Sequence, residues 1–363
     1  MEPPVFRQGN VKKGLSKFRL LVAFGRRYVW KSLRNCVTVL FGRKTYLDEE
    51  ALFFRQCVLH LIGLKPIRKI TCLGLRGEGA GSQALMIMKA INFARSCGLT
   101  YVHTPFTRIE HAERPMKEWA TSWETFFNLG AGEVVCDIPR HEVVNFSANF
   151  NNLERCFGWY WRRDELAHRF KTMVPEFRRK YYLNKSPRTT GEVTVAVHIR
   201  RGDALPDNQD YFTSNETVLR TITAVKRILD IHQAKYRISI YSQGNRADFA
   251  ELSLPDVEFF LDADAIWTME ELIEADILVM AKGCFSYYAA LISDGIKIGD
   301  PDRWSISPTD SWIPTDGWVP CQVDGSFDSA AFERQLLVLI QAKALPATKA
   351  ESGGRPSPPG LVK

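Results

Sequence analysis

The fold class is decided by residues 193–203, which read Val-Thr-Val-Ala-Val-His-Ile-Arg-Arg-Gly-Asp. The apolar, β-branched run Val193–Ile199 predicts a buried strand. It ends directly in two guanidinium groups and a carboxylate, a composition that does not belong in a core. In a parallel α/β sheet, ligands bind at the carboxyl ends of the strands, so the pattern favours a ligand loop over a plain surface ion-pair cluster.

Apolar runs and helical periods alternate on both sides of this strand. We predict a sheet with both faces covered by helices, as in doubly wound α/β proteins. Towards the C-terminus the predicted elements are a helix over Thr217–His232, strands over Arg237–Tyr241 and Val257–Leu261, a helix over Thr268–Ala275, a strand over Ile277–Met280, a helix over Ser286–Ser293, a strand over Gly295–Ile298 and a closing helix over Ala330–Leu345.

The first half of the chain begins a second βαβ unit. Its predicted parts are a strand at Ile70–Leu75, a glycine-rich turn at Arg76–Ser82, a helix at Gln83–Ser96 and a strand at Leu99–His103. A chain of 363 residues suits two domains. We predict an N-terminal arm over 1–47, a first Rossmann-like domain over 48–185, a second over 186–345 and a disordered tail rich in Ser, Gly and Pro over 346–363.

The net charge of +7 is concentrated in the arm. Residues 1–46 hold eleven Lys or Arg and one acid, Glu2, which leaves the remaining 317 residues at −3. A near-neutral body argues against a nucleic-acid-binding protein. Residues 10–41 space their apolar side chains at near-helical intervals, so they form either an interfacial helix on an anionic membrane or a terminal helix docked on the protein.

The eight cysteines are scattered, without a C-x-x-C pair, as expected for reduced thiols in a cytoplasmic protein. No apolar stretch approaches the roughly 20 residues of a membrane span. We therefore expect a cytoplasmic protein, with the arm as its one route to the inner face of a membrane.

The loop at the end of the predicted strand carries a family resemblance. His198-Ile-Arg200-Arg201-Gly-Asp203 resembles the H-x-R-R-x-D motif of the α1,2-, α1,6- and protein O-fucosyltransferases, which take fucose from GDP-fucose. The resemblance implies that Arg200 holds the β-phosphate and compensates the charge of the leaving group, with His198, Arg201 and Asp203 beside it. Arginine suits a diphosphate because its planar fork can hold two oxygens and stays charged.

A second segment resembles the late motif of the same family, where a strand runs into a loop of small residues and a helix opening Phe-Ser. Here that segment is Ala275–Ala290, with Gly283, Cys284, Phe285 and Ser286 as the candidate donor-binding residues. We expect Ser286 to cap the helix, whose first amides would then bind the pyrophosphate.

The third match is the glycine loop Gly77-Glu78-Gly79-Ala80-Gly81-Ser82-Gln83, which is similar to the family's G-x-G-N-Q loop. It departs from that pattern by having Ser82 where the family has Asn. Gly79, Gly81 and Gln83 are donor-binding candidates by this resemblance. Glu78 is either a general base for the acceptor or a solvated loop carboxylate. The glycines do not read G-x-G-x-x-G, which argues against a dinucleotide site.

Acidic and aromatic residues elsewhere supply weaker candidates. Asp262-Ala-Asp264 is a D-x-D, but Arg200 and Arg201 already provide positive charge, so we expect a loop that contacts the nucleoside, and no metal ion or other cofactor. His103, Arg108, Glu110 and His111 follow a strand of the first domain and are the acceptor-side candidates; the alternative is an ordinary polar loop. The tryptophans at 119, 123, 159 and 161 either stack on sugars or belong to the core.

The resemblance implies a GT-B fold, with two Rossmann-like domains facing a cleft, and an inverting, metal-independent transfer of fucose from GDP-fucose to a glycan acceptor. The catalytic candidates are Arg200, Asp203 and Glu78, and Asp207 and Asp210 remain alternatives for the base. Three other functions stay open: transfer from another nucleotide sugar, glycan or anion binding without catalysis, and an adaptor acting on membranes or nucleic acid through residues 10–41.

Overall fold

The computed structural model describes residues 56–57, 59–60, 63–73, 78–135, 142–157, 163–188, 190–208, 210–300, 315 and 317–344. The predicted arm and tail lie outside these ranges. None of the helices within them combines the length and apolar character needed to cross a bilayer.

The C-terminal half is built on a six-stranded parallel sheet with the order β10-β9-β8-β5-β6-β7. Its strands are β5 (Val193–His198), β6 (Tyr236–Ser242), β7 (Val257–Leu261), β8 (Ile277–Val279), β9 (Ile296–Gly299) and β10 (Val319–Pro320). The chain leaves β5 in one direction for β6 and β7, and returns to its other side for β8. The point where the order reverses therefore lies between β5 and β8.

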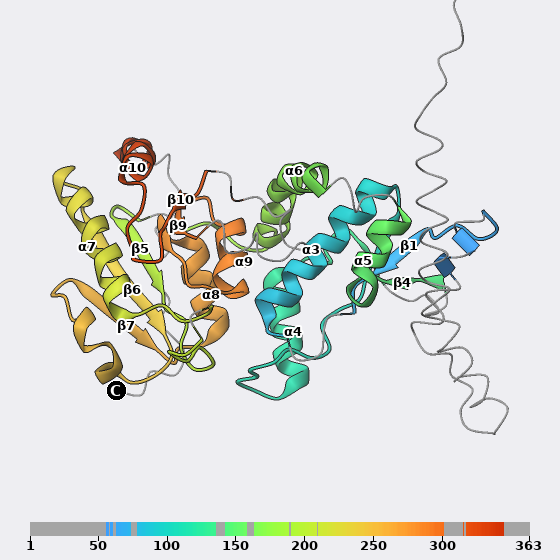
Figure 1. Cartoon of the computed structure of the whole chain (residues 1–363), viewed down its shortest axis with the longest axis horizontal. Helices are drawn as coiled ribbons and strands as arrows, with labels where there is room; N and C mark the ends of the chain where they lie inside the picture. Colours follow the sequence, from blue (N-terminus) through green and yellow to red (C-terminus); the bar gives the residue numbers. More distant parts are fainter. Residues whose placement is uncertain are drawn as a thin grey trace, which may run out of the picture.

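Helices cover both faces of this sheet (Figure 1). One face carries α7 (Asn215–Ile231), the short 3₁₀ segment η2 (Arg246–Leu252) and α10 (Ser329–Ala344), which enclose a core with Val193, Val195 and Val197 of β5. The other face carries α8 (Ala265–Glu274) and α9 (Cys284–Ile292). Side chains alternate along a strand, so Ala196 and His198 lie on the α9 side.

The N-terminal half has a smaller parallel sheet with the order β3-β2-β1-β4. Its strands are β1 (Lys69–Thr71), β2 (Thr100–His103), β3 (Val134–Val135) and β4 (Val144–Asn145). Its helices are α3 (Ala80–Cys97), α4 (Met116–Phe127), α5 (Phe146–Cys156) and α6 (Arg163–Tyr182). Helix α3 is buried along most of its length, since its Ala and Gly residues let its neighbours approach closely and its larger apolar side chains pack in the core.

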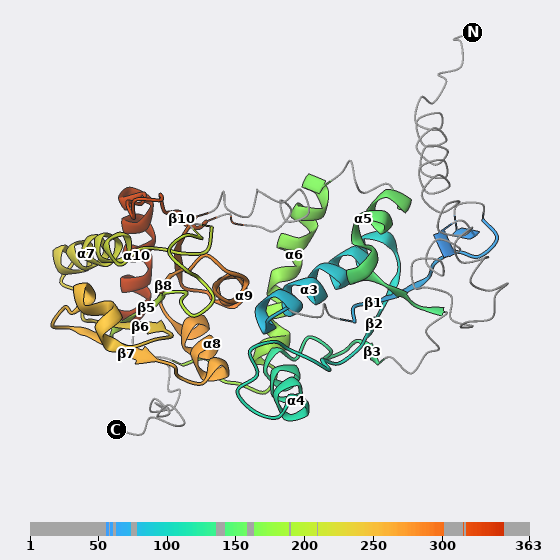
Figure 2. The ribbon, with the colours of Figure 1, turned by 60° about the horizontal axis from the view of Figure 1, so that its bottom comes forward.

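The two halves share one hydrophobic core. Helices α8 and α9 of the second sheet pack against α3, α4 and α6 of the first half (Figure 2). Aromatic rings meet across this seam, with Phe127 against Tyr288 at 4.5 Å and Trp123 against Phe285 at 6.4 Å between centroids. The first turns of α3 and α9 are thereby held together.

The prediction of an α/β fold with two parallel sheets, one in each half, is confirmed. The predicted boundary at 185/186 falls between α6 and β5 and remains a prediction. Four helices begin two or three residues before their predicted starts: α3 at Ala80, α7 at Asn215, α8 at Ala265 and α9 at Cys284. Helix α3 thus begins inside the predicted glycine turn, and α9 has Gly283 and not Ser286 as its N-cap.

Candidate active site

The three sequence motifs meet at one place, where the end of β5 lies beside the first turns of α9 and α3. This is the reversal point of the six-stranded sheet, where open α/β proteins bind ligands. Residues from both halves contribute to it.

Arg200 is the cation at the centre of this place. Its Nε and Nη2 atoms donate to the two carboxylate oxygens of Asp203, at 3.0 and 2.6 Å, and its Nη1 donates to the carbonyl of Lys282 at 3.3 Å. The bond to Arg200 lowers the pKa of Asp203, so that carboxylate stays charged and holds the guanidinium in place. A side chain at Gly283 would come within 2.9 Å of Nη1, so Gly283 leaves room for Arg200 at the start of α9.

Arg201 points in another direction. It donates to the Arg200 carbonyl at 2.9 Å and to Asn215 Oδ1 at 2.8 Å, and its guanidinium lies 4.4 Å from the ring centre of Phe212. Burial lowers the pKa of Arg201. These contacts fasten the loop to the start of α7, on the face opposite α9, and give Arg201 a supporting role.

His198 and Ser286 are joined by a short hydrogen bond of 2.5 Å between Nδ1 and Oγ. Ser286 is fully buried, and its Oγ also accepts from the backbone N–H of Ala281 at 3.0 Å. Burial, and then the charge of Arg200, lower the pKa of His198 to about 4. The expected helix cap at Ser286 is therefore corrected to a bridge between β5 and the loop before α9.

The first turns of α3 and α9 approach in backbone contact. A Cβ at Gly81 would lie 2.6 Å from the Cys284 carbonyl oxygen, so only glycine fits there without a shift. Neither helix has a side-chain cap or an acidic residue in its first turn. The first amides of a helix have no partner within that helix, and here the positive ends of two helix dipoles come together beside Arg200.

The loop before α3 is braced by Gln83. Its side-chain nitrogen donates to the carbonyls of Glu78 and Arg108, both at 2.8 Å, and the residue is buried. The amide of Glu110 adds a bond to the Glu78 carbonyl at 3.2 Å. The side-chain amide of Gln83, which we expected to contact the donor, therefore positions the loop instead. Glu78 precedes the first turn of α3.

The acceptor-side candidates divide into two sets. His111 is exposed, its ring would lie 3.9 Å from a side chain at Gly79, and its charge lowers the pKa of Asp203, so it faces the site from the first half. Its φ of 58° is unusual for a residue with a side chain. Arg108 and Glu110 pair with each other at 3.1 Å on the same loop.

His103, by contrast, belongs to the core of the first half. It is buried, its Nε2 lies 2.8 Å from Glu124 and its ring packs against Gly130. The expectation that His103 faces the acceptor is corrected, since strand β2 turns its side chain inwards. Trp119 and Trp123 are likewise buried in the shared core and cannot stack on sugars, and the tryptophans at 159 and 161 lie outside the described residues.

The D-x-D residues have structural partners. Asp264 is the N-cap of α8, accepting from the Trp267 amide at 2.9 Å, and forms an ion pair with Arg114 of the first half. Asp262 accepts from the Gly244 amide at 3.3 Å. Within the described ranges, no three His, Cys, Asp or Glu side chains cluster closely enough to hold a metal ion.

A pocket opens between α7 and the ends of β5, β8, β9 and β10, with Lys282, whose carbonyl accepts from Arg200, in its lining. Its space of about 700 Å³ includes open solvent. Val197, Val218, Val279 and Ile298 give it apolar lining, and His198, Lys282, Asp300 and Gln322 give it polar lining.

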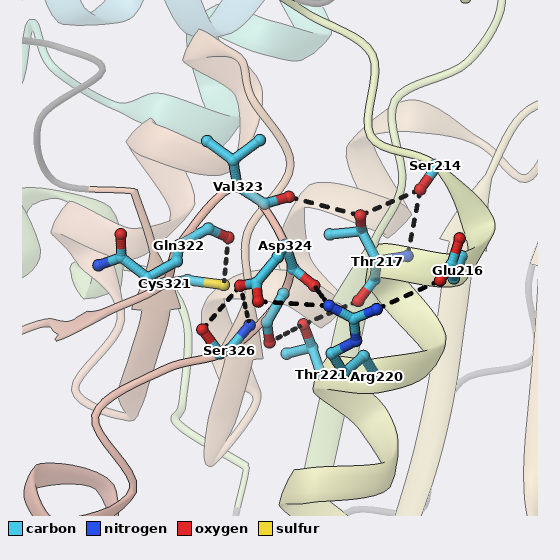
Figure 3. Close-up of polar contacts among 11 residues, drawn as sticks. Ser214, Glu216, Thr217, Arg220, Thr221, Cys321, Gln322, Val323, Asp324 and Ser326 are labelled. Atoms are coloured by element: carbon cyan, nitrogen blue, oxygen red, sulfur yellow. Dashed lines mark hydrogen bonds and ion pairs between the residues drawn. The ribbon is translucent and has the colours of Figure 1, made fainter.

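One wall of this pocket is a strap, residues 321–326, tied to α7 (Figure 3). Thr217 donates to the Val323 carbonyl at 3.4 Å, Thr221 to the Gly325 carbonyl at 2.9 Å and Arg220 to the Asp324 carbonyl at 2.9 Å. Sequence reasoning missed this strap, and also Tyr211, whose ring centre lies 4.5 Å from the Arg200 guanidinium.

Comparisons with known proteins add a fold-level likeness. No protein-family model and no curated protein matches the sequence. Similar solved structures include POFUT1 in complex with GDP-fucose, with a TM-score of 0.34, 12% identity, and 63% of this chain and 94% of that chain covered. Another is the E. coli heptosyltransferase WaaC with ADP, with a TM-score of 0.35, 11% identity and coverage of 76% and 100%.

A third is the UDP-GlcNAc 2-epimerase from Neisseria meningitidis, with a TM-score of 0.30, 9% identity and coverage of 86% and 81%. Likenesses at this level carry no argument about chemistry. The functional argument therefore rests on the residues of the site itself.

Proposed function

We propose that the chain is a GT-B glycosyltransferase that transfers fucose from GDP-fucose to a glycan acceptor, with inversion and without a metal ion. The observation that carries the proposal is the meeting of two uncapped helix N-termini, from different halves, beside the Asp203-held guanidinium of Arg200. Backbone amides, helix dipoles and one fixed cation are what a diphosphate needs.

The chemistry follows from that arrangement. An acceptor hydroxyl attacks the anomeric carbon, the bond from that carbon to the β-phosphate oxygen breaks, and GDP leaves with the electron pair. Arg200 and the amides of α3 and α9 stabilise the charge that develops on GDP. One displacement from the opposite side inverts the anomeric carbon.

Proton removal from the acceptor needs a base near the first half. Asp203 is a poor candidate, because both of its oxygens already accept from Arg200 and its pKa is lowered. Glu78 stands at the entrance of α3, on the side where His111 faces the site. We propose Glu78 for this role, with Asp207 and Asp210 as the alternatives.

The donor is tested by thermal shift with GDP-, UDP- and dTDP-sugars, each with and without excess EDTA, followed by assay of GDP release from GDP-fucose. We expect GDP and GDP-fucose to stabilise the protein equally with and without chelator, because Arg200 replaces the metal. A strict requirement for Mg²⁺ or Mn²⁺ would refute the metal-free mechanism. Binding without GDP release, with acceptor glycans present, would instead indicate an anion-binding protein.

A further inference from the structure

The hydrogen bonds around Ser286 fix where the proton of His198 lies. Ser286 Oγ accepts from the Ala281 amide and lies 2.5 Å from His198 Nδ1. A serine hydroxyl has a single hydrogen to donate. Ser286 is fully buried, and among the contacts of the described residues His198 Nδ1 is the one acceptor that this hydrogen can reach.

The two possible directions of this bond differ in energy. If His198 donated from Nδ1, the Ser286 hydrogen would be buried without an acceptor, which costs about 1–3 kcal/mol. If Ser286 donates, every polar atom of the bridge is satisfied. The Nδ1 atom then carries a lone pair, and the hydrogen of the neutral ring is on Nε2.

The surroundings of the ring favour the neutral form. Arg200 follows on the same strand end, Lys282 of the loop after β8 lines the same pocket, and α9 presents the Phe285 ring with its centre 5.4 Å from that of His198. On β6, the residue in register with His198 is the buried Tyr241. No carboxylate among the described residues bonds to the imidazole, and the nearby cations disfavour a second proton.

The Nε2–H group is left for a ligand. His198 is half-buried and lines the pocket between α7 and the ends of β5 and β8. Within the described part of the chain, no acceptor takes a hydrogen bond from Nε2. An N–H at the reversal point of the sheet, beside the Arg200 loop, lies at the edge where open α/β proteins bind ligands.

We propose that Ser286 is a positioning residue that locks His198 in its Nε2–H tautomer, so that His198 donates a hydrogen bond to an oxygen of the bound nucleotide. The ligand in this statement rests on the proposed function, whereas the tautomer does not. His198 then has no lone pair facing the site and cannot act as the base for the acceptor.

The tautomer is read from the imidazole ¹⁵N chemical shifts of the uniformly labelled full chain in long-range ¹H–¹⁵N spectra at neutral pH. The chain has seven histidines, and a His198→Asn variant assigns the His198 signals. We expect an unprotonated Nδ1 and a protonated Nε2 in the wild-type protein. An Nδ1–H tautomer or an imidazolium would overturn the proposal.

Ser286→Ala should release the lock, giving mixed tautomers and a higher titration midpoint for His198. The matched control is Ser293→Ala, which removes a buried serine at the end of the same helix whose hydroxyl accepts from the Gly295 amide at 3.0 Å. The control should lose similar stability and leave the His198 signals unchanged. If the His198 signals of Ser286→Ala are the same as those of the wild-type protein, Ser286 is not a positioning residue. If that variant does not fold, the wild-type spectrum alone tests the tautomer.

GDP binding to the same proteins tests the donated bond. We expect Ser286→Ala to weaken GDP binding about tenfold more than Ser293→Ala, the loss of about one hydrogen bond to a charged group. A changed tautomer with unchanged GDP affinity would refute donation to the nucleotide. If His198 has the expected tautomer but the protein binds no nucleotide, Ser286 still fixes the tautomer of His198 and the proposed function is wrong.

Discussion

Arg200 and Arg201 are adjacent in the sequence and have opposite surroundings in the structure. Arg200 lies on the α9 side, aligned by Asp203 and beneath Tyr211. Arg201 lies on the α7 side, between Phe212 and Asn215. The motif therefore combines a ligand-facing cation with one that holds the loop.

Replacement of each arginine by lysine should separate these roles. Lysine keeps the charge of Arg200 but cannot donate to Asp203 and to the diphosphate at the same time. We therefore expect Arg200→Lys to lower the turnover of GDP-fucose by a factor of about 10²–10³, by analogy with the loss of one charge-stabilising donor. Its GDP affinity should fall less than its turnover. Arg201→Lys should mainly lower the melting temperature. Near-normal turnover in Arg200→Lys, measured as released GDP, would contradict the assignment.

Gly81 tests the contact between the two halves. Gly81→Ala places a methyl group 2.6 Å from the Cys284 carbonyl oxygen, so α3 and α9 must separate. We expect a loss of about 1–3 kcal/mol in the free energy of unfolding and weaker GDP binding. The control is Gly191→Ala, where a methyl group meets nothing within 4 Å. If titration calorimetry gives the two variants equal GDP affinities, the amides of α3 do not take part in GDP binding.

Residues of the site were predictable from sequence only where a motif and a strand end coincide. His198, Arg200 and Ser286 meet as expected because a parallel sheet brings strand ends to one edge. The roles of Gln83 and His103 were not predictable, since both depend on contacts with residues more than 20 positions away, Arg108 in a loop and Glu124 in α4. Tyr211 and Phe212 were missed for the same reason.

At the level of elements, the strands and most helices follow from local periodicity. Strand β7 has its predicted bounds, and β5 differs from its prediction by one residue. The starts of α3 and α9 were misplaced because Gly79, Gly81 and Gly283 look like turn residues in the sequence. In the structure Gly81 is helical and is required by the approach of another helix, which local pattern cannot reveal.

The strap over α7 gives an element-scale prediction. Gly325 has a φ of 88°, and a methyl group there would overlap the Thr217 carbonyl. We expect Gly325→Ala to detach the strap and destabilise the protein by about 2–4 kcal/mol, combining overpacking with backbone strain. Gly317→Ala is the control, because Gly317 has a φ of 81° but open space around it. Urea unfolding should show a larger loss in the free energy of unfolding for Gly325→Ala than for Gly317→Ala. Equal losses would mean that backbone strain at a positive φ accounts for the whole effect, without the overlap with Thr217.

For the whole molecule, the shared core makes the two halves interdependent. Arg114 pairs with Asp264, and Arg178 bonds the carbonyls of Leu291 and Ser293, so both ends of the seam are fastened by ion pairs or charged hydrogen bonds. Glu113 adds a bond to the Ala265 amide at 3.2 Å. Sequence periodicity indicates two α/β units, but their joint core follows only from the packing of α8 and α9 against α3, α4 and α6.

The stability of the whole molecule should depend on His198 at mildly acid pH. Its pKa is lowered to about 4, whereas an unfolded histidine has a pKa of about 6.5. Between these values the unfolded chain binds the additional proton, so the stability due to neutral His198 is complete above about pH 6.5 and is lost as the pH falls towards 4.

His198→Asn removes this proton and leaves the other titrating groups in place, including Glu113, whose pKa burial raises. We expect the free energy of unfolding of the wild-type protein to fall more steeply from pH 6.5 to 4 than that of His198→Asn, by urea titration at each pH. Parallel curves would mean that His198 accepts its proton as readily in the folded protein as in the unfolded chain.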